Sequence, residues 1–136
     1  MLAQNFMTAA DLGLEPEEQA ALVTLLVMLE RGELVHVPNE DFIPMGMAKK
    51  FTGGFNMAVW KAETDDCGSV CCIGGSAELV GGLRGNQLFG RAHGNPDLEE
   101  LFYPGGYLGK ITVPQAASAL RNYLTTRHAS WSEVLS

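Results

Sequence analysis

The sequence predicts a mainly α fold, a single compact helical domain with up to two short strands. The chain has 136 residues, of which 46% are hydrophobic and 18% are charged, the size and composition of one globular domain with a buried core. Long segments near both ends repeat apolar residues at helical spacing and carry helix-start signals. The segments with strand character are short. We therefore treat residues 1–136 as one domain.

Charge and apolar patterning exclude several classes of partner. The formal net charge is −7, and an acidic chain repels phosphate backbones, so we expect no nucleic-acid partner. The most apolar segment, residues 20–29, is far shorter than the roughly 20 residues that span a bilayer, and residues 1–6 lack the basic start of a secretory signal. Three cysteines cannot all pair internally. We therefore expect a cytoplasmic protein without membrane contact.

The first long helix is predicted over Pro16–Arg31. Pro16 suits the first helical position, and the glutamates around it complement the positive end of the helix dipole. Gly32 is a suitable stop. A shorter turn or helix is predicted over residues 8–12, with Thr8 as its cap. The apolar positions of the long helix form one wide buried stripe: Leu22, Leu25, Leu26 and Leu29, flanked by Val23, Val27 and Met28.

The next part of the chain has weaker patterns. Residues 34–38 are predicted to be extended, as a short strand at a sheet edge, because Pro38 restricts Val37 to the β or polyproline region. Residues 39–52 are ambiguous, with a short helix expected over residues 45–51. Residues 55–60 are predicted to form a second strand with alternate apolar residues on one face.

All three cysteines lie within residues 65–77. We predict a helix over Ser69–Gly81 with Cys67 at or near its start, and we expect this helix at the centre of the core. Two glycines inside it each cost roughly 1 kcal/mol against alanine, so tertiary contact must offset them. The small residues form a narrow face that lets another backbone approach closely. That face comprises Cys67, Cys71, Gly74, Gly75 and Glu78.

The second half of the chain contains clear signals for helix starts and ends. Residues 83–94 are predicted to be a loop. Asn95 caps a short helix over residues 96–102, which ends before Pro104. The last long helix is predicted over Val113–Thr126, with a capping box between Thr112 and Gln115. Its buried stripe comprises Val113, Ala116, Ala117, Leu120 and Leu124. The apolar residues near the end of the chain should dock a final turn onto the core; these are Trp131, Val134 and Leu135.

Cys67 is the candidate for covalent chemistry. A helix N-terminus lowers the pKa of a thiol, whereas Asp65 and Asp66 would raise it. A cysteine-dependent hydrolase or acyltransferase would use Cys67 as nucleophile and His93 or His128 as base. Residues 66–70 are loosely similar to the nucleophile segment of cell-wall peptidases of the papain-like superfamily. The alternative interpretation is that Cys67 is a small residue packed at a tight turn, and we favour it because close packing also explains the glycines.

A metal site would need Cys67, Cys72 and a histidine. The Cys-x₃-Cys-Cys spacing is not that of a zinc site, and there is no second cysteine pair. The glycine-rich residues 81–85 lack the phosphate-binding and dinucleotide-binding patterns. We therefore expect no metal and no other cofactor.

The cysteine segment also supports a resemblance. Residues 67–77 match the pattern Cys-Gly-Thr-x-x-Cys-Ile-x-Gly-x-Ala, with Ser69 in place of threonine. Residues 55–57 and 111–121 match two further stretches of the same proteins. The chain thus resembles an uncharacterised family of small bacterial and phage-associated proteins. In this resemblance, Cys67 and Cys72 correspond to the two cysteines of the pattern. The resemblance implies one compact unit with the cysteines at its structural centre.

The sequence therefore favours a non-enzymatic interaction or structural module that self-associates into a homo-oligomer. The basis of this prediction is that the sequence is rich in apolar residues and contains no set of catalytic groups that would converge on one site. The cysteine-dependent enzyme and the metal-binding protein are the two alternatives.

Overall fold

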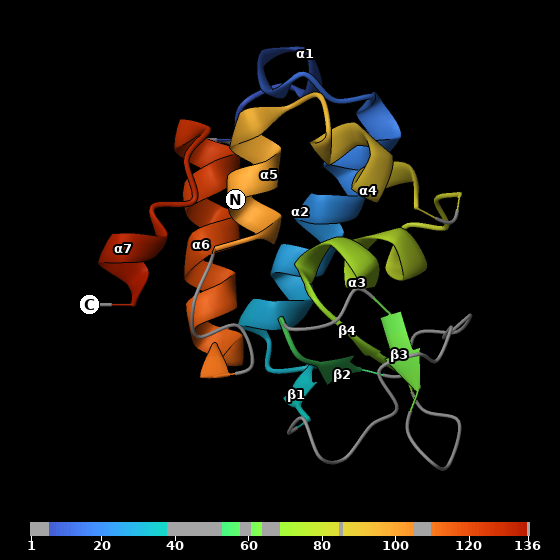
Figure 1. Ribbon diagram of the computed structural model, residues 1–136, viewed down its shortest axis with the longest axis vertical. Coiled ribbons are helices and arrows are strands. Elements are labelled where there is room, and N and C mark those ends of the chain that lie inside the picture. Colours follow the sequence, from blue (N-terminus) through green and yellow to red (C-terminus); the bar gives the residue numbers. More distant parts are fainter. Residues whose placement is uncertain are drawn as a thin grey trace.

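Helices dominate the computed structural model (Figure 1), which confirms the predicted mainly α fold. The structure describes residues 6–37, 53–57, 61–63, 69–84, 86–104 and 110–135, with side chains omitted for residues 61–63, 69 and 70. Within them the helices are α1 (Ala9–Leu12), α2 (Pro16–Glu30), α3 (Ile73–Val80), α4 (Gln87–Ala92), α5 (Pro96–Phe102), α6 (Val113–Thr126) and α7 (Trp131–Val134). The strands are β1 (Val35–His36), β2 (Gly54–Phe55), β3 (Lys61–Glu63) and β4 (Ser69–Cys71).

The five longer helices enclose the core. Helix α2 contacts α3 on one side and α6 on the other, and the contacts α3–α4, α4–α5 and α5–α6 close a ring. The central positions of the predicted α2 stripe are buried, and its flanking residues Val23, Val27 and Met28 are half-buried. The predicted stripe of α6 is buried except for half-buried Val113. The cysteine helix α3, predicted to lie at the centre of the core, is one member of this ring, between α2 and α4, and its residues 73–78 are buried.

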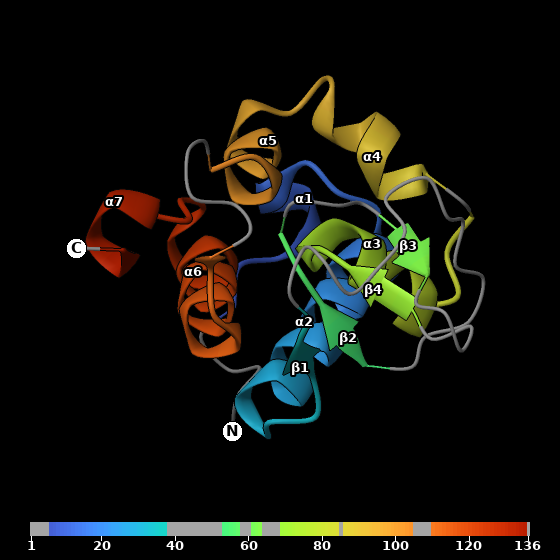
Figure 2. The same ribbon diagram turned by 60° about the horizontal axis from the view of Figure 1, so that its bottom comes forward.

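A small sheet lies at one end of the helices (Figure 2). Its order is β1-β2-β4-β3, with β1–β2 and β2–β4 parallel and β3–β4 antiparallel. The predicted edge strand appears as β1. Of the second predicted strand, residues 55–60, the structure forms Phe55 within β2, and residues 58–60 lie outside the described residues. The expected helix over residues 45–51 also lies outside them.

The predicted helix starts of α1, α5 and α6 are confirmed. The Thr8 hydroxyl accepts a hydrogen bond from Asp11 N, 3.1 Å away, and Asn95 Oδ1 accepts one from Leu98 N at 3.2 Å. At the start of α6, the Thr112 and Gln115 side chains each accept a hydrogen bond from the other's backbone N–H. Each such cap is worth about 1 kcal/mol.

The predicted end of α2 and the predicted C-terminal turn are also confirmed. Gly32 follows α2 with φ +73°, the left-handed conformation that suits glycine after a helix. The C-terminal turn forms α7, and Trp131 is buried with its indole N–H donating to Glu100 O at 3.0 Å.

The predicted helix over Ser69–Gly81 is corrected at its start. Residues 69–71 form β4, which is held between β2 and β3, and helix α3 begins only at Ile73 with Cys72 as its N-cap. Pairing with β2 and β3, which precede these residues in the chain, fixes them as extended. The helix N-terminus therefore lies at Cys72 and not at Cys67, which lies outside the described residues.

The predicted loop over residues 83–94 is also corrected, because residues 87–92 form α4. The buried carboxylate of Glu78 in α3 accepts hydrogen bonds from three backbone N–H groups at the start of α4. They belong to Asn86 at 2.9 Å, Leu88 at 2.7 Å and Phe89 at 3.2 Å. A side chain from another helix thus supplies the cap that the local sequence lacks.

Candidate functional site

Cys71 and Cys72 are buried cysteines, not joined in a disulfide, at the junction of β4 and α3. The carbonyl oxygen of Cys71 accepts a hydrogen bond from Asn56 N at 3.1 Å, and that of Cys72 accepts one from Ser76 N at 2.9 Å. The two cysteines thus continue the sheet and start the helix. Their burial agrees with the expectation that Cys71 packs.

Burial decides the chemistry of Cys72. Its side chain stands at the helix N-terminus, where the backbone N–H groups of Gly75 and Gly74 favour the thiolate. Desolvation nevertheless outweighs them and raises the pKa of the thiol to about 11. Cys72 is therefore a protonated, poorly nucleophilic thiol near neutral pH.

The two candidate bases lie at helix ends. His93 follows α4, where its Nδ1 is 3.0 Å from Phe89 O and its ring packs edge-to-face on that of Phe89. His128 follows α6, with its Nδ1 3.7 Å from a carboxylate oxygen of Asp97. The nucleophile Cys67 lies outside the described residues, so the Cys67–His93 and Cys67–His128 pairs stay predictions.

Neither a metal site nor a membrane span appears in the described part of the chain. Within it, no group of three or more His, Cys, Asp or Glu side chains is placed to hold a metal ion. None of the helices in the described ranges has the length and apolar character needed to cross a bilayer. The metal site at Cys67 and Cys72 also stays a prediction, since it requires Cys67.

A groove with several apolar side chains lies between the end of α2 and the start of α6, and we call it the α2–α6 groove. Its volume is about 530 Å³, within the size range of ligand and peptide sites. Leu29 and Leu34 are almost fully buried in its floor, while Pro114 and Ser118 are exposed at its rim. Among the described residues, its lining comprises Leu29, Glu30, Gly32, Leu34, Val113, Pro114, Ala117, Ser118 and Arg121.

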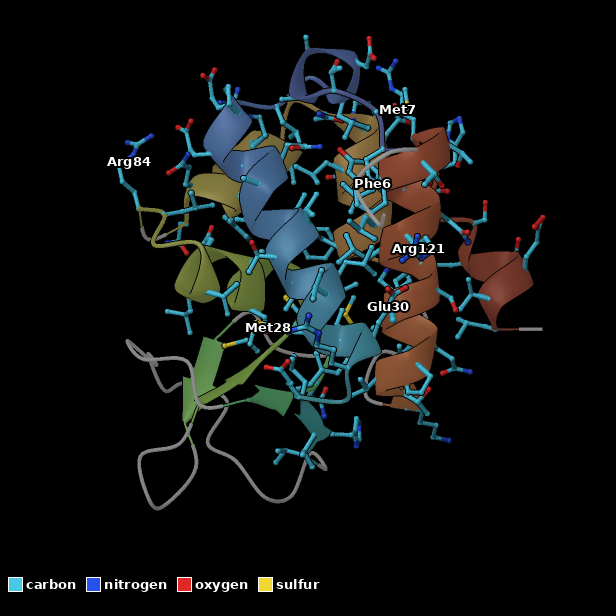
Figure 3. The ribbon with its side chains drawn as sticks, turned by 180° about the vertical axis from the view of Figure 1, so that it is seen from behind. Phe6, Met7, Met28, Glu30, Arg84 and Arg121 are labelled. Carbon is cyan, nitrogen blue, oxygen red and sulfur yellow. The ribbon has the colours of Figure 1, made fainter. Side chains whose placement is uncertain are left out.

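One ion pair bridges the two helices at this groove (Figure 3). Arg121 donates from Nε to one Glu30 oxygen at 2.7 Å and from Nη2 to the other at 2.6 Å. The pair is bidentate, but both side chains are about one-third exposed, so its net contribution to stability is of the order of 1 kcal/mol or less. The pair therefore places one positive and one negative group beside the groove and adds little to stability.

A second, polar pocket of about 320 Å³ lies beside α4. Its buried carboxylate, Glu18, accepts hydrogen bonds from Gln87 Nε2 at 2.9 Å and Arg91 Nε at 3.0 Å. Burial alone would raise the pKa of Glu18, but these bonds and one from Glu15 N outweigh it and lower the pKa. The charge of the Glu18 carboxylate is thus balanced within the protein. Its hydrogen bonds to Gln87 and Arg91 attach α4 to α2.

Sequence reasoning identified neither the α2–α6 groove nor its ion pair. Glu30 and Arg121 are 91 residues apart, and no local pattern joins them. The available signal was indirect: both residues lie beside the predicted buried stripes of two long helices.

Comparison with known proteins adds no identification. No protein-family model, curated protein or solved structure matches this chain. The resemblance at the cysteine segment therefore stays a prediction.

Proposed function

We propose that this chain is a non-enzymatic interaction module that pairs with a second copy of itself through the face formed by α2 and α6. The observation that carries the proposal is the α2–α6 groove, with apolar walls and a charged pair at one end. We expect this module in the cytoplasm.

The charges of the groove favour a second copy as the partner. In a two-fold dimer the same patch meets itself, so each group on one copy needs its complement on the same patch. Glu30 and Arg121 provide such a set, because in a two-fold arrangement Arg121 of one copy can approach Glu30 of the other. The exposed rim of the groove, at Pro114 and Ser118, gives the apolar walls a contact surface.

The two alternatives, a cysteine-dependent hydrolase or acyltransferase and a metal-binding protein, both depend on Cys67. No described contact favours either of them over the interaction module. Alkylation of Cys67 as a function of pH tests the first alternative, and elemental analysis of the purified protein tests the second.

Size-exclusion chromatography with light scattering, over a wide range of protein concentration, tests the proposed pairing. The wild type is expected to move from monomer mass toward dimer mass as concentration rises. Ser118→Arg places a bulky charge at the rim and should hold the chain at monomer mass. Ser132→Arg makes the same change at another exposed serine, outside the groove, and should behave as the wild type. A chain that stays monomeric at every concentration refutes the pairing.

A further inference from the structure

The head group of Arg121 in α6 is held from two sides within its own chain. Its Nε and Nη2 groups donate to the two carboxylate oxygens of Glu30 at 2.7 and 2.6 Å. The centroid of the Phe6 ring lies 5.7 Å from the guanidinium carbon, a cation–π contact. Figure 3 shows the Phe6, Arg121 and Glu30 side chains following one another between α2 and α6. The orientation of the guanidinium is therefore fixed within the single chain.

Phe6 is itself anchored by the residue that follows it. Met7 N donates to Leu124 O in α6 at 2.8 Å, and Met7 O accepts a hydrogen bond from Gln19 Nε2 in α2 at 3.1 Å. The backbone next to Phe6 is thus bonded to both helices. The contact between Phe6 and Arg121 is therefore supported by hydrogen bonds as well as by side-chain packing.

The guanidinium of Arg121 keeps hydrogen-bond donors that Glu30 does not use. An arginine side chain has five N–H groups, and Glu30 takes only the edge formed by Nε and Nη2. The edge formed by Nη1 and the second N–H of Nη2 is a fork that binds a carboxylate through two parallel hydrogen bonds. Among the described residues, no other acceptor contacts this guanidinium. About one-third of the side chain is exposed, so a partner can reach the free fork.

Glu30 keeps acceptors that match this fork. An ionised carboxylate has two oxygens with about four lone-pair sites, and Arg121 occupies one site on each oxygen. Each oxygen can therefore accept one more hydrogen bond. The Glu30 side chain is also about one-third exposed, and both residues line the α2–α6 groove. One patch thus holds two spare donors beside two spare acceptors.

A patch with this content is complementary to itself. A two-fold axis brings each group of the patch onto its counterpart in the other copy. The free fork of Arg121 in one copy can then meet the oxygens of Glu30 in the other, and the reciprocal contact forms at the same time. The four groups alternate in sign and have a total charge of zero. Both Arg121–Glu30 pairs within the chains stay intact, so no existing bond has to break.

We propose that Glu30 and Arg121 of two copies form a four-charge cluster, and that this cluster makes the α2–α6 face select a second copy of the same chain. The inference rests on the proposed function, because it assigns the polar contacts of the proposed pairing. Complementary charges contribute more to the specificity of an interface than to its affinity, and like charges that face each other oppose binding. The apolar walls of the groove supply contact area, and the four-charge cluster sets the partner and its orientation.

Charge reversal tests the four-charge cluster. Arg121→Glu gives a patch with two carboxylates, and Glu30→Arg gives a patch with two guanidiniums. Each variant alone is expected to pair with itself at least about 100-fold more weakly than the wild type. An equimolar mixture of the two variants is expected to pair again, because two carboxylates then face two guanidiniums. Light scattering with one of the chains fused to a carrier protein distinguishes the mixed dimer from the self-paired ones by mass.

Neutral and distant variants supply the controls. Arg127 forms an ion pair with Asp97, with Nε 2.7 Å from the carboxylate oxygen, outside the groove, so Arg127→Glu should pair as the wild type does. Arg121→Gln and Glu30→Gln introduce no repulsion, and they keep the test open if a reversed variant does not fold. Each of them removes two contacts between the copies and should weaken pairing about tenfold.

The results separate the four-charge cluster from the pairing itself. Self-pairing of either reversed variant at wild-type strength refutes the cluster, and so does a mixture of folded reversed variants that stays monomeric. If the wild type pairs and Ser118→Arg does not, these results leave the proposed pairing in place without the cluster. A wild type that stays monomeric at every concentration refutes the proposed pairing, and the cluster with it.

Discussion

Replacing Gly81 with alanine tests how closely α3 approaches α2. Gly81 is the C-cap of α3 and has φ −87°, a conformation open to any residue. A Cβ atom added there would lie 2.4 Å from Cβ of Ala21 in α2 and 2.9 Å from the backbone oxygen of Ala77. The cost of the substitution is therefore steric and not conformational.

The magnitude follows from the two distances. Non-bonded carbons pack at about 3.5–4.0 Å, so α3 and α2 must separate locally by more than about 1 Å. Overpacking of this kind costs about 1–3 kcal/mol, and the loss of unfolded-state entropy on replacing glycine returns about 0.4–1 kcal/mol. We expect Gly81→Ala to lower the free energy of unfolding by about 1.3 kcal/mol, or the melting temperature by about 5 °C.

Urea unfolding followed by circular dichroism measures this change. The matched control is Gly90→Ala within α4, where a new Cβ meets nothing within 4 Å and should stabilise the protein by about 0.5–1 kcal/mol. A double-mutant cycle with Ala21→Gly should recover part of the loss at Gly81→Ala, since it removes the closer contact. Equal effects at Gly81 and Gly90, or strict additivity with Ala21→Gly, would refute the close approach of the helices.

Three further predictions concern buried polar groups. Glu78→Gln removes the charge that accepts three backbone N–H groups at α4 and should cost about 2–4 kcal/mol in urea unfolding, whereas the same change at exposed Glu100 should cost less than about 0.5 kcal/mol. The pKa of Glu18 is lowered in the folded state from its ordinary value of 4.5. The stabilising contribution of its carboxylate is therefore present above pH 4.5 and is lost as the pH falls through the folded pKa. The difference in the free energy of unfolding between the wild type and Glu18→Gln should narrow in acid. Cys71 and Cys72 should resist a thiol reagent in the native protein at pH about 8 and react fully in denaturant, and fast native labelling of either one would contradict their burial.

Helix starts were predictable where the capping group lies within three residues of the group that it caps. Thr8, Asn95 and the Thr112–Gln115 box all satisfy this condition. Such contacts form in one turn of chain, so the sequence contains both partners side by side. The same locality explains why the left-handed stop at Gly32 was predictable.

The two wrong predictions have the opposite character. Strand β4 is extended because it pairs with β2 and β3, and α4 starts where Glu78 of another helix accepts its N–H groups. Local propensity does not include either partner. The α2–α6 groove is a further case, because it exists only after helices distant in the sequence have packed.

The cysteine segment shows how one physical effect overrides another. A thiol at a helix N-terminus is activated only if the helix dipole and the N–H groups outweigh the cost of burying a thiolate. At Cys72 burial moves the pKa from 9.0 to about 11 even though backbone N–H groups at the helix terminus lower it. Burial therefore outweighs those groups by about 3 kcal/mol on the thiolate. Cys71 is also buried. Any fast-reacting thiol of the native protein must therefore be Cys67, and a Cys67→Ser variant that keeps such a thiol would contradict this assignment.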